Sequence, residues 1–207
     1  MKKLFVLVLL VAFLMTSAAF AEGFVASPSV RPSQVLATLL LDENGAPVVD
    51  DGFEIVIIEK NERVIELGTE LVEFLQTAPI HEYFGQELFA EAIPLMPENC
   101  AAEDYQLNEF EAIEQHGYAP EMGDAGAVFE FAEDYPSDAV LLAFVGIEPI
   151  AVEGEAPAEG EEAAQIAWTP LPAFVDNGKV VVVFSQDVLT KMMDENINTV
   201  LTVLQAR

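Results

Sequence analysis

Apolar positions recur in short runs along the second half of the chain, and the clearest set lies at its end. An apolar run over 168–175 is followed by the turn residues 176–178 (DNG), and a second run, KVVVVFS, occupies 179–185. Residues 187–196 then have a helical pattern, and 199–204 form a closing β-rich run. Short β-branched runs bounded by turn residues are typical of strands. This order predicts strand, tight turn, strand, short helix and strand.

Three more strands are predicted upstream of this region. Residues 127–132 (AVFEFA) alternate between two faces, and 139–147 (AVLLAFVGI) have the unbroken apolar character of a buried strand. Residues 107–113 also alternate, with Leu107, Glu109 and Glu111 on one side, which favours a strand and leaves a helix as the alternative. The second half is therefore expected to be mostly β.

The first half begins with two strand candidates, over 35–41 and 53–58. Two turn signals lie between them: Asn44-Gly45, which is suited to positive φ, and Asp50-Asp51-Gly52. We therefore expect an antiparallel pair with a long connection.

Helices are predicted after this pair. Residues 61–78 have apolar positions at helical spacing, with Asn61 as a plausible N-cap and Pro79 at the end. A second short helix is predicted over 86–93. Residues 97–104 have turn residues without periodicity, which makes them a candidate domain boundary.

The N-terminus has the pattern of a secretory signal peptide over 1–21. Lys2 and Lys3 precede an apolar core over 4–15, and Ala19-Phe20-Ala21 forms a small-x-small cleavage site. The stretch is short for a membrane span, and an uncleaved anchor is the alternative. We expect a mature chain, 22–207, that is exported, soluble and free of the membrane.

The charge is strongly acidic. The net charge of −28 becomes −30 once Lys2 and Lys3 are removed with the signal peptide. Such a surface repels phosphate backbones and anionic lipid head groups, so nucleic acid is excluded as a partner. The 52% apolar content nevertheless favours a folded core. The low-complexity stretch 151–164 is expected to be an acidic loop between two strands.

Few residues point to chemistry. Cys100 is the single cysteine, so no internal disulfide exists. Its acidic neighbours disfavour a thiolate, and an incidental thiol is favoured over a reactive or intermolecularly paired one. His81 and His116 are too few for an ordinary three-ligand zinc site without help from carboxylates, and they are interpreted as surface or interface histidines. No nucleophile elbow, phosphate loop or dinucleotide fingerprint is present, so we expect no enzyme and assign no catalytic, cofactor or metal residues.

Calcium is the one cofactor worth weighing. Oxygen-bearing residues lie in predicted loops, and calcium prefers such ligands. The same residues are common at turns because their side chains bond the local backbone. The candidates are Asp42, Glu43 and Asn44; Asp50 and Asp51; Asp134 with Asp138; and Asp176 with Asn177.

Two apolar features could serve either core packing or ligand binding. Trp168, the lone tryptophan, could form a sugar-stacking platform with a nearby tyrosine, although core packing is the default for aromatic residues. Val188, Leu189, Met192 and Met193 fall on one face of the last helix. Methionines there could form an adaptable binding face, but filling the end of a sandwich is the favoured use.

Residues 107–204 resemble immunoglobulin-like β-sandwich modules of exported proteins of gut-type Gram-positive bacteria. The resemblance is carried by AVFEFAEDYPSDAVLLAFVGI, by WTPLPAFVDNGKVVVVFSQDVL and by VLTVLQ. It implies a structural or adhesive module and transfers no functional residues. The inter-sheet cysteine pair that such modules often have is absent here.

The predicted fold class is α+β. A small β-hairpin-plus-helix unit (22–103) is followed by an immunoglobulin-like antiparallel β-sandwich (104–207). The predicted function is a secreted or cell-surface, non-catalytic interaction module for a protein or glycan partner. The alternative is an exported hydrolase or accessory factor with a carboxylate site between the two halves.

Overall fold

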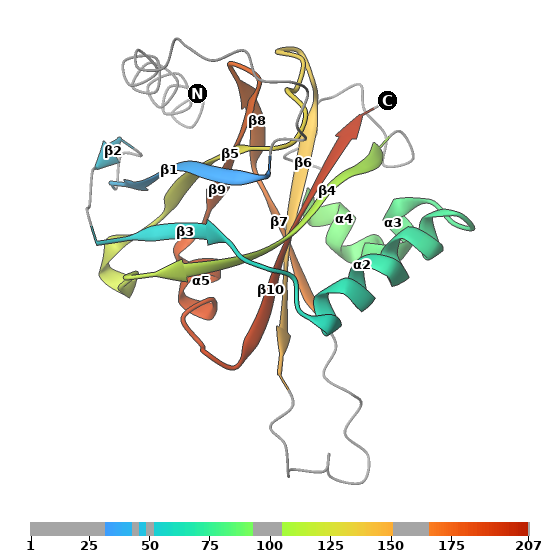
Figure 1. Cartoon of the computed structure of the whole chain (residues 1–207), viewed down its shortest axis with the longest axis horizontal. Coiled ribbons are helices and arrows are strands. Elements are labelled where there is room, and N and C mark those ends of the chain that lie inside the picture. Colours follow the sequence, from blue (N-terminus) through green and yellow to red (C-terminus); the bar gives the residue numbers. More distant parts are fainter. Residues whose placement is uncertain (1–31, 43–45, 49–51, 93–104, 151–165, 207) are drawn as a thin grey trace, which may run out of the picture.

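The protein is built mainly of antiparallel strands arranged in two sheets (Figure 1). The predicted signal peptide, Cys100 and the acidic stretch 151–164 lie outside the residues that the structure describes. The computed structural model describes residues 32–42, 46–48, 52–92, 105–150 and 166–206.

Within the described ranges, ten strands make up the sheets, five in each. The first sheet has the order β2-β1-β5-β9-β8 and the second has the order β3-β4-β10-β6-β7. The strands of the first sheet are β1 (Gln34–Leu41), β2 (Pro47–Val48), β5 (Ala125–Glu130), β8 (Ala173–Asp176) and β9 (Lys179–Phe184). Those of the second sheet are β3 (Glu54–Ile57), β4 (Tyr105–His116), β6 (Leu141–Pro149), β7 (Ala167–Leu171) and β10 (Ile197–Ala206). The helical segments are α2 (Glu62–Leu75), α3 (Ile80–Phe84), α4 (Gln86–Ala92), the 3-10 turn η3 (Pro120–Met122) and α5 (Gln186–Lys191).

The main core lies between the two sheets. Phe129 and Phe184 from the first sheet and Ile113 and Leu201 from the second belong to one cluster, and each is fully buried. Their burial follows from the alternation of side chains along each strand, which sends every second residue inward. The arrangement is a β-sandwich with an apolar interior.

Helices α2, α3 and α4 cover the outer face of the second sheet (Figure 1). Helix α2 begins where the Asn61 side chain accepts a hydrogen bond from the Val64 amide at 2.9 Å, as predicted for its N-cap. From α3, the Phe84 ring stacks on Phe144 of β6 with the ring centroids 4.2 Å apart. The second sheet is therefore buried on both faces, and Val200 and Leu201 on opposite faces of β10 are both at 0% exposure.

The predicted pairing of 35–41 with 53–58 is wrong. Strand β1 pairs with β2 and β5, whereas β3 pairs with β4 in the other sheet. The reason is a tight closure at Asp42, whose amide donates to the Ala46 carbonyl at 2.9 Å while its carboxylate accepts from the Ala46 amide at 2.8 Å. This closure folds β1 back onto β2, and β3 is left to pair elsewhere.

The apolar run over 168–175 is two strands instead of one. Strand β7 pairs with β6 in the second sheet, and β8 pairs with β9 in the first. The chain changes sheet at Pro172, which has no amide hydrogen to give to a ladder. The predicted turn after it is confirmed, because Asn177 and Gly178 have φ of 49° and 80°, as a tight hairpin requires.

The other predicted elements appear close to their expected places. The strand over 107–113 is the long β4, which settles the choice against a helix, and the last helix is the short α5. Helix α3 was not predicted. None of the helices within the described ranges is long and apolar enough to cross a membrane. The division into units 22–103 and 104–207 stays a prediction, since its boundary is not described, but strands from both sides share both sheets.

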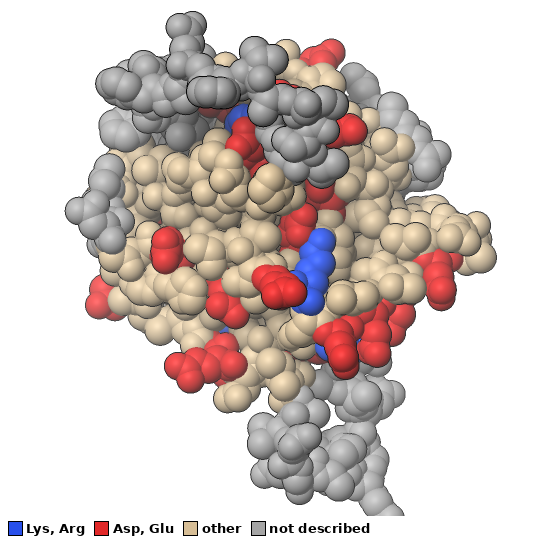
Figure 2. Space-filling view, in the orientation of Figure 1, with Lys and Arg blue, Asp and Glu red and all other residues tan. Residues whose placement is uncertain are grey.

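The surface is rich in carboxylates. Figure 2 shows acidic side chains across the visible face and few basic ones among them. Most charged side chains on this face are therefore carboxylates.

Candidate functional site

A carboxylate cluster lies where the start of the first sheet meets β4. Glu109, Glu111 and Ile113 share one face of β4, and Ile113 is part of the core between the sheets. The two glutamates therefore face the interior near its margin. Ser33 precedes β1 and Lys60 precedes α2, so the first half of the chain supplies two of their neighbours.

The contacts within this cluster are specific. Glu111 accepts a hydrogen bond from Ser33 Oγ at 2.9 Å through one oxygen and pairs with Lys60 Nζ at 2.8 Å through the other. Tyr135, which follows β5, donates its hydroxyl to Glu109 at 3.2 Å. We call Ser33, Lys60, Glu109, Glu111 and Tyr135 the β4 carboxylate cluster.

The two glutamates of this cluster differ in environment. Burial raises the pKa of Glu109 above its ordinary value, and the hydrogen bond from Tyr135 offsets part of that rise. Burial also raises the pKa of Tyr135, and the charge of Glu109 adds to this. Glu111 instead has a lysine and a hydroxyl on its two oxygens. A carboxyl group with a raised pKa beside a paired carboxylate is the arrangement that acid–base chemistry uses.

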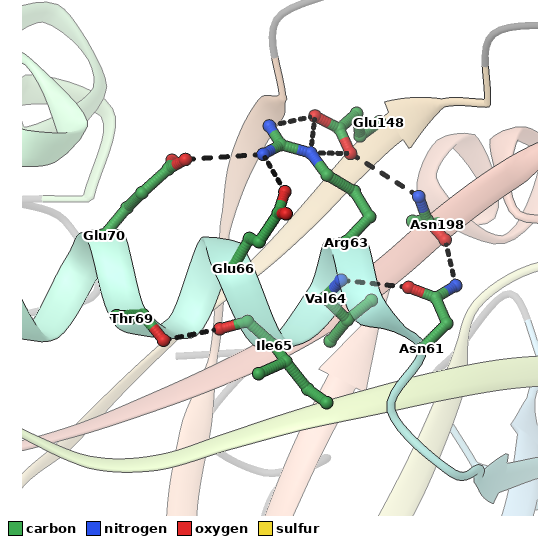
Figure 3. A network of polar contacts seen from close by, with 9 residues as sticks. All are labelled: Asn61, Arg63, Val64, Ile65, Glu66, Thr69, Glu70, Glu148 and Asn198. Atoms are coloured by element: carbon green, nitrogen blue, oxygen red, sulfur yellow. Dashed lines mark hydrogen bonds and ion pairs between the residues drawn. The ribbon is translucent and has the colours of Figure 1, made fainter.

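A second polar cluster joins α2 to the second sheet (Figure 3). Arg63 Nε lies 3.1 Å from both carboxylate oxygens of Glu148, and Nη2 lies 2.7 Å from one of them. Asn198 donates to Glu148 at 3.5 Å and accepts from Asn61 at 2.7 Å. The residue that caps α2 is thus connected to β6 and β10 through side chains alone.

This network has a structural role. Glu148 is 4% exposed, and a buried carboxylate needs a partner to offset its lost hydration. The hydrogen bonds to Glu148 raise the pKa of Arg63, which stays charged throughout the ordinary pH range. The remaining guanidinium nitrogen reaches Glu66 and Glu70 on α2 at 3.4 and 3.3 Å. The contacts with Glu148 therefore join α2 to β6, and the other two lie within the helix itself.

A third charged group lies at one end of the first sheet. Lys179 Nζ is 2.6 Å from Glu130 and 2.8 Å from Asp134, and Gln34 also donates to Glu130 at 2.5 Å. The lysine is mostly buried, with 19% of its side chain exposed. These contacts fasten the start of β1 to β5 and β9.

The structure does not bring the two predicted histidines into a common site. His81 lies in the first turn of α3, and His116 ends β4 with its Nε2 3.7 Å from Glu114. In the described parts of the chain no group of three or more His, Cys, Asp or Glu side chains is placed to hold a metal ion.

The calcium candidates that are described have local structural uses. Asp42 closes the turn after β1, Asp134 pairs with Lys179, and the Asp176 carboxylate accepts from the Asn177 side chain at 3.1 Å. Burial raises the pKa of Asp176. Asp138 lies in the turn before β6, and positions 43, 44, 50 and 51 fall outside the described residues.

Trp168 and the methionines take up mainly packing positions. The Trp168 ring meets the edges of Tyr83 and Phe84, with centroids 6.2 and 5.0 Å away, so a tyrosine is indeed nearby but tilted by 63°. Trp168 also lies over Gly146, where a Cβ would come within 2.7 Å of the indole. Met192 is buried in the core, whereas Met193 is 41% exposed. These rings do not form one flat platform for a sugar.

Sequence reasoning missed the β4 carboxylate cluster and the Arg63–Glu148 network, for different reasons. The alternation over 107–113 already placed Glu109 and Glu111 on one side of a strand, and that was a usable signal for an inward-facing pair. Arg63 and Glu148 are 85 residues apart and have no local pattern that links them.

Comparison with known proteins gives no relative to set beside these clusters. A scan against protein-family models found no match, and searches of curated proteins and of solved structures found none either.

Replacing Arg63 with methionine should destabilise the protein by about 1–3 kcal/mol, because it leaves the buried Glu148 carboxylate without its cation. We set the value below that of a fully buried pair because 41% of the arginine side chain is exposed. Denaturant unfolding measures the change. The double variant Arg63→Met/Glu148→Gln should recover most of the loss, whereas Glu66→Gln, a control on the exposed side, should change stability by less than about 0.5 kcal/mol. Equal losses in all three variants would contradict the role given to Glu148.

Replacing Glu109 with glutamine should stabilise the protein at neutral pH. The folded state raises the pKa of Glu109, so it favours the protonated form, and wild-type stability falls as pH rises through that pKa. Glutamine stays neutral and can still accept from Tyr135. The stability difference between variant and wild type should therefore shrink as pH falls toward the ordinary glutamate value. Unfolding curves between pH 4 and 8 measure it, with Glu114→Gln on the exposed face of β4 as control; a pH-independent difference would refute the assignment.

Proposed function

We propose that the protein is a secreted or cell-surface, non-catalytic interaction module of immunoglobulin-like type that binds a cationic protein segment on helix α2. The main observation in support is an exposed aliphatic stripe on that helix, bordered by carboxylates. Export is inferred from the signal-peptide pattern of residues 1–21, and the immunoglobulin-like class from the sequence resemblance of residues 107–204.

The stripe consists of Ile65, Thr69 and Val72, and we call it the α2 stripe. Ile65 and Val72 are 56% and 49% exposed, and residues seven apart lie on the same side of a helix, two turns from each other. The Thr69 hydroxyl donates to the Ile65 carbonyl at 2.9 Å, so its polar group is satisfied by the helix backbone between the two aliphatic side chains. The buried side of α2 holds Val64, Leu67 and Leu71. Core packing thus accounts for the opposite side of the helix and leaves the stripe unexplained.

Charge identifies the class of partner. Four glutamates, Glu62, Glu66, Glu70 and Glu73, are exposed on α2, and in Figure 2 acidic side chains gather over that helix. Arg63 is the single basic residue of the helix and is held by Glu148. An aliphatic stripe among carboxylates complements a segment that carries lysine or arginine beside apolar residues. A glycan would instead need an exposed aromatic face, and the Trp168 ring is packed edge-on to its neighbours.

The hydrolase alternative is favoured by one observation, the raised pKa of Glu109 beside the paired Glu111. In this alternative Glu109 would donate a proton to a leaving group, and the site would lie between the two halves of the chain, as Ser33 and Lys60 come from the first and Glu109 from the second. The contacts of Glu109 and Glu111 also fasten β4 to neighbouring elements, and this structural use favours the interaction module.

A peptide titration tests the proposal. The probe is a synthetic amphipathic peptide of leucine and lysine, and its comparison is the same peptide with serine in place of leucine. The mature protein should bind the first more tightly, and Ile65→Ser/Val72→Ser should weaken that binding by at least about tenfold, since two aliphatic contacts are lost without a change of charge. Isothermal titration calorimetry gives both affinities.

The matched control is Val48→Ser, which removes an aliphatic side chain of similar exposure, 45%, from β2. Binding that is equal for both peptides, or equally weakened by the control, would show only diffuse attraction to an acidic protein and would reject the α2 stripe. Hydrolysis of a panel of glycosides, esters and peptides by wild type but not by Glu109→Gln would instead establish the enzyme alternative.

A further inference from the structure

The α2 stripe has an apolar neighbour on the side of the sheet. At about 100° per residue around a helix, Gly68 lies roughly 60° to one side of Ile65, and it falls between Ile65 and Val72 along the axis. A Cβ at Gly68 would come to 3.2 Å from the Phe110 ring of β4, so this ring occupies the space that a side chain at position 68 would take. Phe110 is only partly buried. The apolar surface of the stripe therefore continues across Gly68 onto the second sheet.

The carboxylates of α2 lie on the other side of the stripe. Glu62 and Glu73 are roughly 60–80° from Ile65 around the helix, in the direction away from Phe110, and the other two glutamates lie further round. In Figure 3 these two, Glu66 and Glu70, are at the edge of α2 opposite to Ile65. The stripe thus has one apolar flank and one acidic flank.

The spacing of the exposed aliphatic side chains matches the repeat of a helix. Ile65 and Val72 are seven residues apart, which is about 10.5 Å along the helix axis. A second helix lying along α2 repeats its side chains at the same interval, from i to i+7. Side chains on one face of an extended segment recur at about 6.8 Å and then about 13.6 Å. An extended segment therefore cannot place two side chains in register with this pair.

We infer that the partner segment is an amphipathic α-helix that lies along α2. Its apolar face packs on the α2 stripe and Phe110, and its lysine or arginine residues point toward the acidic flank. This inference rests on the proposed function and adds the conformation of the partner and the side on which its charges lie. Charge argues against a second copy of this chain as the occupant, because a second α2 would bring four more glutamates to the same surface.

Two peptides with the same numbers of leucine and lysine test the inference. In the first, leucines recur at helical spacing, and in the second, leucine and lysine alternate as in a strand. In isothermal titration calorimetry the mature protein should bind the helical peptide at least about tenfold more tightly, because only this peptide presents its apolar side chains in register with the stripe. Difference circular dichroism should show a gain of helix in the complex. Both effects should be lost in Ile65→Ser/Val72→Ser.

The outcomes separate this inference from the proposed function. Equal binding of the two peptides that Ile65→Ser/Val72→Ser abolishes would overturn the helix and leave the proposed function in place. Absence of binding, or binding that this variant leaves unchanged, would overturn both. Self-association of the protein alone, measured by sedimentation and abolished by the same variant, would make a second copy the occupant and also overturn the inference.

A pair of charge variants tests the acidic flank. Glu62→Gln/Glu73→Gln removes the two carboxylates nearest the stripe, and the control Glu87→Gln/Glu91→Gln removes two exposed carboxylates from α4. The two variants change the net charge equally, so they weaken general attraction to an acidic protein equally. The first should weaken binding of the helical peptide by at least about threefold more than the control does. Equal effects of the two variants would overturn the placement of the partner's charges.

Discussion

The structure depends on one constraint, that a strand with apolar side chains on both faces must be covered on both faces. Strand β10 shows it most clearly, because Val200 points toward α2 and Leu201 toward the first sheet, and both are fully buried. The second sheet buries one apolar face against the helices and the other against the first sheet. Strand β9, with its four consecutive valines, places the same demand on the first sheet. The layers of the protein follow from these two strands.

The polar clusters lie at the margins of those layers, where charged groups can form ion pairs without losing all their contact with water. Arg63 and Glu148 hold α2 at the end of β6, and Lys60 and Glu111 join the first half of the chain to β4. Such pairs add little net stability compared with apolar packing, but leaving one partner alone is costly. This explains why ion pairs are found where one element meets another. The exposed aliphatic residues of α2 have no such role, and packing does not require them.

Local patterns predicted the elements well and their partners poorly. The Asn61 cap, the Asn177-Gly178 turn and the alternation of β4 are properties of short stretches, and each appears in the structure. The pairing of β1 with β5, instead of the segment over 53–58, depends on the closure at Asp42, and the division of 168–175 depends on which sheet each side of Pro172 joins. The inward pair Glu109 and Glu111 was visible in the alternation, whereas the Arg63–Glu148 contact depends wholly on the tertiary fold.

The central claim is that both sheets form one cooperative body in which β1 and β3 are integral strands. Native-state hydrogen exchange of the mature protein tests it most directly, because it reports the free energy of opening for each amide. The account predicts that the protected amides of β1 and β3 exchange with the same free energy and the same denaturant dependence as those of β4, β5, β9 and β10. Exchange of residues 34–92 as a separate unit, well below the free energy of 105–206, would contradict it.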